Sequence, residues 1–183
     1  MTGSRQSTAP SRWIARFAPL IAPGAVLDVA CGAGRHTALL RALGHDVTAI
    51  DRDISRLGPL ADDAGVEALE ADLEDGGPWP LGARRFAGVV VANYLHRPLL
   101  PALIGAVGEG GVLIYETFAA GNERVGRPSN PDFLLRPGEL LAAVAGELAV
   151  IAYESGVVET PKPAVIQRIC ARRGDAPAAL REL

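Results

Sequence analysis

The sequence predicts an α/β fold: a doubly wound seven-stranded sheet that is mostly parallel and ends in an antiparallel C-terminal hairpin. Five short apolar runs alternate with helix-length segments, which is typical of βαβ units with helices on both faces of a parallel sheet. The last two apolar runs are separated by "GVVETPKP", residues 156–163, which is too short for a crossover helix and favours antiparallel pairing. Gly, Ala, Val and Leu dominate the composition, which suits a core of many small contacts.

Each strand is expected where an apolar run is bounded by turn residues. The parallel strands are expected at residues 25–30, 46–51, 66–71, 86–92 and 111–118, and the hairpin strands at 147–155 and 164–173. Helices are expected at 35–43, 54–64, 97–108 and 139–146, with a poorer candidate at 76–85. Apolar residues at helical spacing predict one more helix within residues 11–21.

The chain length fits one domain, expected to span residues 1–183, with a core that needs no metal or disulfide. No apolar run approaches the roughly 20 residues of a membrane span, and the N-terminus lacks the apolar segment of a secretion signal. Cys31 and Cys170 are therefore expected to be reduced, in a cytoplasmic protein. A net charge of −3 with interspersed signs gives no footprint for nucleic acid or an anionic membrane, although it excludes neither. No oligomeric state is indicated.

A glycine turn joins the first predicted strand to the next helix in "VLDVACGAGRHTALL", Val26 to Leu40. Open α/β sheets bind ligands at the carboxyl ends of their strands, near the point where strand order reverses. Gly32 and Gly34 can adopt backbone angles closed to other residues and leave the main chain open to a ligand. The helix beginning near Arg35 would direct free N–H groups at that ligand. A plainer interpretation is a turn that only links strand to helix.

Acidic residues accompany three successive strands and favour a nucleoside pocket. Asp28 lies in the first strand, Asp51 closes the second, and Asp72 follows the third in "EADLED". In such folds a carboxylate at the position of Asp51 accepts hydrogen bonds from a ribose diol, and Asp72 is placed to accept one from an adenine amine. A single acid after a strand is commonly a helix cap or a solvated residue, but three in succession predict a shared site.

Missing residues decide which nucleoside fits. A dinucleotide fingerprint needs a third glycine three residues after Gly34, where this chain has Thr37. A phosphate-binding loop needs a lysine that "GAGRHT" lacks. Asp28 would repel a polyphosphate but suits a cationic, amine-bearing ligand. The pattern therefore favours S-adenosylmethionine as the cofactor.

On these residues the chain resembles the class I S-adenosylmethionine-dependent methyltransferases, from about Val26 to Arg173. "LDVACGAGR" is similar to the first motif of that family, with alanine at position 30 where glycine is more usual, and "CGAGRHT" with "GHDVTAIDRD" is similar to the small tellurite-resistance and thiol-methyltransferase-like members. The resemblance implies a Rossmann-like methyltransferase fold and a helical cap at residues 1–24; packing of that helix on the sheet is the alternative. It also implies cofactor contacts from Asp28, Ala30, Gly32 and Gly34 around the methionine, Asp51 with Arg52 at the ribose, Asp72 with Leu73 at the adenine, and Asn93 near the transferred methyl.

The acceptor side is expected after the fourth strand, in "ANYLHRP". Tyr94 and His96 are candidate catalytic residues, and His96 can serve as a base near neutral pH. Arg97 is a candidate substrate-binding residue. The alternative is that His96 and Arg97 cap or solvate the start of the next helix. "NYLH", residues 93–96, has no prolines, which argues against methylation of adenine or glutamine amines, because such enzymes often carry two prolines and an aromatic residue after this strand.

A long segment interrupts the chain after the fifth strand. Residues 119–137 are predicted to form a substrate lid, because loops of this length in compact domains usually bind ligands. Its arginines can engage an anionic substrate. Arg127 is a candidate catalytic residue and Arg124 a candidate substrate-binding residue. Arg136 can also contact the substrate. Glu116 and Thr117, at the end of the fifth strand, are expected to border this cavity. The alternative is that the arginines form a solvated surface with Glu123, Asp132 and Glu139.

Together these patterns predict a methyltransferase that uses S-adenosylmethionine to methylate a small, anionic or soft nucleophilic molecule. The reaction is an in-line displacement whose rate depends on holding the reactants in line in a dry site, and a base is needed only for a protonated nucleophile. One alternative is a non-catalytic module that binds S-adenosylmethionine or S-adenosylhomocysteine. A weaker alternative is an NAD(P)-dependent reductase, which Thr37 and the terminal hairpin disfavour.

Overall fold

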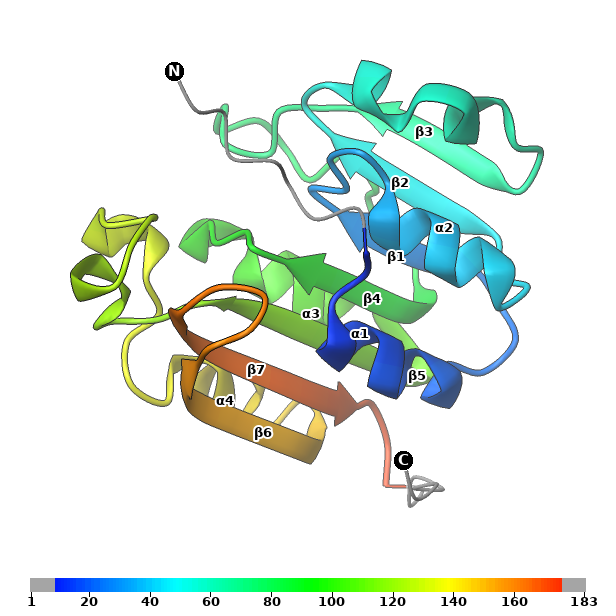
Figure 1. Ribbon diagram of the computed structural model, residues 1–183. Coiled ribbons are helices and arrows are strands. Elements are labelled where there is room, and N and C mark those ends of the chain that lie inside the picture. The colour runs from blue at the N-terminus through cyan, green and yellow to red at the C-terminus, as the bar shows by residue number, and fades with distance from the viewer. Residues whose placement is uncertain (1–8, 176–183) are drawn as a thin grey trace.

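The computed structural model describes residues 9–175, and its centre is a seven-stranded sheet with the order β3-β2-β1-β4-β5-β7-β6 (Figure 1). The five parallel strands are β1 (Val26–Val29), β2 (Val47–Asp51), β3 (Val66–Glu70), β4 (Phe86–Ala92) and β5 (Val107–Phe118). The last two, β6 (Ala149–Val158) and β7 (Ala164–Arg172), pair antiparallel, and β7 also pairs antiparallel with β5. The predicted fold class is confirmed, terminal hairpin included.

Helices cover both faces of the sheet, as the alternation of apolar runs predicts (Figure 1). One face is covered by α1 (Arg12–Phe17) and α2 (Arg35–Ala42), and the other by α3 (Leu100–Ala106) and α4 (Glu139–Val144). Short 3-10 helices complete the set: η1 (Ala18–Leu20), η2 (Ile54–Asp62), η3 (Arg97–Leu99), η4 (Asn122–Arg124) and η5 (Pro131–Phe133). Among residues 9–175, no helix has the length and apolar character needed to cross a membrane.

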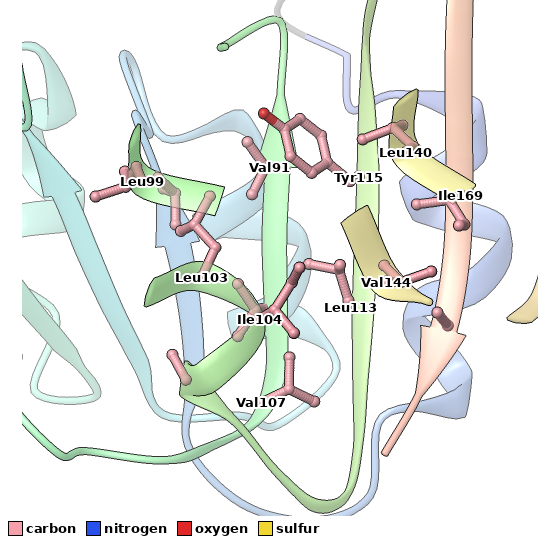
Figure 2. Packing of buried hydrophobic residues seen from close by; sticks show 14 of the residues in the cluster. Val91, Leu99, Leu103, Ile104, Val107, Leu113, Tyr115, Leu140, Val144 and Ile169 are labelled. Atoms are coloured by element: carbon pink, nitrogen blue, oxygen red, sulfur yellow. The ribbon is translucent and has the colours of Figure 1, made fainter. Parts of the chain in front are cut away.

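The sheet separates two hydrophobic layers, because successive side chains of a strand point to opposite faces. On the α3 and α4 side, Leu103 of α3, Leu140 of α4 and Ile169 of β7 are almost completely buried in one cluster (Figure 2). On the α1 and α2 side, Trp13 and Leu40 are buried in a second cluster with residues of the parallel strands such as Val47 and Ile114. Burial of each such side chain contributes on the order of 2 kcal/mol. These layers fix the ends of the parallel strands in place.

Two helix predictions are wrong, for local reasons. Residues 76–85 form turns rather than a helix: Gly76 and Gly82 have positive φ angles of 79° and 53°, and Pro78 and Pro80 cannot donate backbone hydrogen bonds. Residues 54–62 are 3-10 helical and break at Gly58, where φ is 55° and ψ is −132°, immediately before a proline.

Other boundaries move by a few residues. The helix expected at 97–108 begins as η3 and ends at Ala106, and β5 begins at Val107, four residues earlier than predicted. The N-terminal helix lies within the predicted stretch 11–21, and Ser11 caps it by accepting hydrogen bonds from the N–H groups of Trp13 and Ile14. Residues 1–8 of the expected cap lie outside the described residues.

Candidate active site

A cavity of about 570 Å³ opens at the carboxyl edge of the parallel strands. It is bordered by the ends of β1 and β4, which are neighbours in the sheet and stand where the strand order reverses. From β1 the chain continues to β2 and β3 on one side, and from β4 to β5 on the other. Ligands of open α/β sheets bind at this point, and the volume lies within the roughly 300–1,000 Å³ of small-molecule sites. The cavity is thus at the edge where the sequence predicts a ligand.

The glycine turn between β1 and α2 forms one wall, and its two glycines are required for different reasons. At Gly34, with φ of 73°, an added Cβ would lie 2.7 Å from methyl carbons of both Leu57 and Leu60, so this glycine allows close packing of η2. At Gly32, with φ of 57°, a Cβ would meet only the Arg56 guanidinium, at 3.9 Å. The main chain at Gly32 is therefore open on the cavity side.

Asp51 ends β2 and lines the cavity beside this turn. Its Oδ2 accepts a hydrogen bond from the Gly32 N–H at 2.8 Å, and its Oδ1 accepts one from the Asp53 N–H at 3.1 Å. Each carboxylate oxygen has a second lone pair for a ligand hydroxyl. The carboxylate thus fixes the turn and remains able to accept from a diol.

Asp28 is not among the residues that line the cavity, although the sequence predicts it beside the methionine. It is 1% exposed, and its Oδ2 accepts a hydrogen bond from the Thr37 hydroxyl at 2.6 Å. Burial raises the pKa of Asp28 from 3.8 to about 6, and the hydrogen bonds from Thr37 oppose that rise. Thr37, which replaces the third glycine of a dinucleotide fingerprint, therefore joins α2 to β1 beneath the turn.

Ala30 and Asn93 line the cavity from the ends of β1 and β4, and both have positive φ angles, of 52° and 56°. This conformation is costly for residues other than glycine, and such strain gathers at functional sites. Asn tolerates it better than most residues. The Asn93 N–H donates to the carbonyl of Glu116 at 2.9 Å, which fixes the loop after β4 against β5.

Of the residues predicted at the adenine and ribose edge, Asp51 lines the cavity, whereas Arg52, Asp72 and Leu73 do not. Arg52 and Asp72 are exposed, and the Asp72 carboxylate accepts the N–H of Glu74 at 2.9 Å. Leu73 and Tyr94 are partly buried against the core. Burial first, and then the nearby carboxylates of Glu74, Asp72 and Asp51, raise the pKa of Tyr94 well above its usual range. Tyr94 therefore stays protonated at neutral pH and does not suit the role of a base.

His96 and Arg97 do not line the cavity. His96 is half-buried at the start of η3 and makes no capping hydrogen bond with its side chain. The Arg97 guanidinium donates to both carboxylate oxygens of Glu139, at 2.7 and 3.0 Å, and to the carbonyls of Asp132 and Leu134, both at 2.8 Å. These contacts agree with the structural alternative for Arg97, which fastens the segment after β5.

That segment, the predicted lid, follows β5 (Figure 1) and is anchored near both ends by side-chain hydrogen bonds, from Asn122 at one end and from Arg97 at the other. Asn122 is 1% exposed; its Nδ2 donates to the Pro128 carbonyl and its Oδ1 accepts the Val165 N–H. Arg124 and Arg127 are exposed and do not line the cavity, and the Arg124 guanidinium lies 3.8 Å from the Glu123 carboxylate. The structure thus places the lid arginines outside the cavity wall, and their predicted roles in substrate binding and catalysis stay predictions.

Glu116 and Thr117 lie at the end of β5 but face protein rather than the cavity. Thr117 is 1% exposed. Glu116 accepts a hydrogen bond from the Ser11 hydroxyl at 2.7 Å and pairs with Arg168 at 3.2 Å. The Ser11 N–H donates to His36 Nε2 at 3.1 Å, so Glu116 helps to hold the N-terminal segment against α2.

Several cavity residues were missed by the sequence analysis because they come from segments far apart in the chain. Arg35 and His36 belong to the first turn of α2, Arg56 to η2, Phe118 to the end of β5, and Lys162 to the turn between β6 and β7. Only Lys162 carries a compositional signal, because it is the one lysine in 183 residues. Cys31 also lines the cavity, and burial raises the pKa of its thiol well above the usual range.

Comparison with known proteins identifies the architecture. A family model described as tellurite resistance protein TehB matches residues 8–75. TehB from Haemophilus influenzae has a TM-score of 0.69 at 20% identity, over 86% of this chain and 60% of that one. The S-adenosylhomocysteine-bound 1,6-didemethyltoxoflavin-N1-methyltransferase from Burkholderia thailandensis has a TM-score of 0.65 at 20% identity, over 87% and 75%. The fold is that of the S-adenosylmethionine-dependent methyltransferases.

A sequence relative supports the same methyltransferase resemblance. Trans-aconitate 2-methyltransferase from Methylobacterium radiotolerans is 32% identical over 114 residues, which are 59% of this chain and 43% of the relative. The match thus spans less than half the length of that curated protein. The resemblance to methyltransferases of the tellurite-resistance type is confirmed.

Proposed function

We propose that this protein is an S-adenosylmethionine-dependent methyltransferase that acts on a small anionic molecule. The observation that carries the proposal is the cavity at the strand-order reversal, where the open main chain of Gly32, the carboxylate of Asp51 and the strained Asn93 meet. The sequence relative and the structural neighbours, which include methyltransferases, support it.

The described residues fit such a cofactor. Gly32 presents main chain where a side chain would enter the cavity, and Asp51 retains lone pairs for the ribose hydroxyls. Leu60 and Ala92 supply apolar wall on either side of the turn. S-adenosylmethionine supplies a methyl group activated by its sulfonium. The chain's part is to orient the cofactor and exclude water.

Charge in the cavity supports an anionic acceptor. The described side chains in its wall include three cations, Arg35, Arg56 and Lys162, and one carboxylate, Asp51. S-adenosylmethionine adds a net positive charge at neutral pH, so its binding increases the excess of cations. An anion is attracted to such a site, while a cationic amine is repelled. The sequence relative is named for trans-aconitate, which is a carboxylate.

Further parts of the sequence interpretation belong to this proposal. We place the protein in the cytoplasm, since Cys31 and Cys170 are both free and buried. We expect the acceptor to be a metabolite rather than a nucleic acid, because basic residues form no continuous run in the sequence. The catalytic role assigned to His96 stays a prediction.

A thermal-shift series with S-adenosylmethionine, S-adenosylhomocysteine, NAD and NADP tests the cofactor, because a ligand of the folded state raises the melting temperature. We expect stabilisation by the first two only. Labelled S-adenosylmethionine incubated with small carboxylic acids then tests methyl transfer. Binding without transfer to any acceptor would favour the non-catalytic module, and stabilisation by a nicotinamide dinucleotide alone would contradict the proposal.

A further inference from the structure

We propose that Lys162 is the anion-binding residue that selects the acceptor, by pairing with a carboxylate or oxyanion that enters the site already ionised. This inference rests on the proposed function and assigns a role to a residue in the turn between β6 and β7. The turn lies in residues 159–163, far in sequence from the glycine turn, yet Pro161 and Lys162 line the same cavity.

The position of Lys162 separates it from the cofactor end of the cavity. Asp51, Arg56 and Leu60 line the cavity from β2 and η2, on one side of β1. Phe118 and Lys162 line it from β5 and the hairpin turn, on the far side of β4 in the strand order. A cofactor held by Asp51 and the glycine turn leaves the Phe118 and Lys162 end for the acceptor. The acceptor therefore meets an aromatic wall and one ammonium group.

The ammonium of Lys162 is available for a ligand. Lys162 is exposed, and within residues 9–175 no hydrogen bond or ion pair engages it. Arg97 and Arg168, by contrast, are bound to carboxylates of Glu139 and Glu116. The chain has 17 arginines and this single lysine. Because an ammonium acts as a compact point charge without a fixed donor plane, it suits carboxylates and other oxyanions alike.

The remaining cavity residues favour an acceptor that needs no deprotonation. His36 Nε2 accepts the Ser11 N–H, and burial followed by the Arg35 charge lowers the pKa of His36 to about 3. Cys31 stays protonated, since burial and nearby carboxylates raise its pKa. Neither residue, among the described lining, is a base of matched pKa. With an ionised oxygen as nucleophile, an O–CH₃ bond forms as the C–S bond breaks, the electron pair stays on sulfur, and no proton is released.

The single lysine allows a binding test that does not depend on turnover. The protein, saturated with S-adenosylhomocysteine, is acetylated with an N-hydroxysuccinimide ester, and the rate at Lys162 is followed by mass spectrometry with the α-amino group as internal reference. Tricarballylate probes carboxylates, selenite probes inorganic oxyanions, methylammonium is the cationic control, and sodium chloride matches ionic strength. We expect tricarballylate or selenite to slow acetylation of Lys162 several-fold, and the effective probe identifies the acceptor class.

Variants give the second measurement. Lys162→Gln should raise KM for the anionic acceptor about tenfold, with kcat and cofactor affinity within about twofold, since one charge-assisted contact is lost. Lys162→Arg keeps the positive charge and should keep KM for the anionic acceptor close to that of the unmodified protein. The control variant Arg85→Gln removes one exposed charge just before β4, at the end of the strand away from the cavity. It should leave KM, kcat and cofactor affinity unchanged.

The outcomes separate this inference from the proposed function. Failure of S-adenosylhomocysteine to bind would overturn the proposed function and this inference with it. If the cofactor binds but no anion protects Lys162 beyond the effect of chloride, only the assignment of Lys162 fails. Methylation of amines in preference to anions, or an unchanged KM in Lys162→Gln, would also overturn it while leaving a methyltransferase.

Discussion

Single residues at the glycine turn carry strain that the rest of the fold maintains. Ala30 has a φ of 52°, a region that costs a residue with a Cβ about 1–2 kcal/mol. The sequence motif indicated this position, because alanine stands where glycine is more usual. The backbone angle explains the preference for glycine there.

Ala30→Gly should therefore stabilise the protein. Relief of the strain outweighs the added freedom of the unfolded chain, which costs about 0.5–1 kcal/mol, so we expect the free energy of unfolding to rise by up to about 1 kcal/mol. The matched control is Ala33→Gly in the same turn, which has no positive φ and should lose stability. Urea denaturation compares the two. An equal decrease in the free energy of unfolding in both variants would show that Ala30 is not strained.

Asp28 makes stability depend on pH in a defined direction. Its pKa is raised from 3.8 to about 6 by burial, so the folded protein binds the proton more tightly than the unfolded chain does. Stability therefore falls as pH rises from about 4 to about 6, and the loss persists above that range.

Asp28→Asn removes this titration and keeps an oxygen that can accept from Thr37. Relative to the unmodified protein, we expect its free energy of unfolding to increase by about 2 kcal/mol between about pH 4 and about pH 8. Denaturant unfolding at both pH values measures the difference. A difference independent of pH would mean that Asp28 ionises without penalty in the folded state.

At the scale of elements, the connection after β5 depends on one arginine from η3. Arg97 binds Glu139 and two carbonyls of residues 131–135, and the Leu135 N–H donates to the Phe118 carbonyl beside it. The segment is therefore an ordered extension of the sheet edge. Sequence reasoning recognised its length and arginines but could not tell which arginine would be used internally.

Arg97→Gln should loosen this segment selectively. We expect amide hydrogen exchange in residues 130–139 to accelerate about tenfold or more, because several charge-assisted hydrogen bonds are lost. Exchange in β1 and β4 should not change, and Arg85→Gln serves as the surface-charge control. Uniform acceleration across the sheet would indicate global destabilisation instead.

Some elements could be predicted from the sequence and others could not. The strands and the α2 helix were predictable because apolar periodicity and the glycine turn act locally. The stretch 76–85 was misassigned because its arginines and alanine resemble helix surface, while its glycines and prolines prevent helical hydrogen bonding. Asp51 was predictable from its distance to the glycine turn. Lys162 and His36 were not, because only the folded sheet brings them to the same cavity.

At the scale of the whole molecule, the reversal of strand order between β1 and β4 brings the ends of four parallel strands and the hairpin turn around one cavity. The hydrophobic layers on the two faces, of which Figure 2 shows the one beneath α3 and α4, hold these ends fixed. The antiparallel β7, paired with β5, brings the hairpin turn with Lys162 to the cavity. In the proposed function, the cofactor is held on the β1 and β2 side of this cavity and the acceptor on the β5 and hairpin side.

The central claim is that this cavity binds an S-adenosyl cofactor through the glycine turn and Asp51. Calorimetric titration of S-adenosylhomocysteine into the unmodified protein and into Asp51→Ala tests it most directly, with NAD as the comparison ligand. We predict binding of S-adenosylhomocysteine alone, weakened by about 1–3 kcal/mol in Asp51→Ala. Equal affinity in both proteins, or binding of NAD in its place, would contradict the claim.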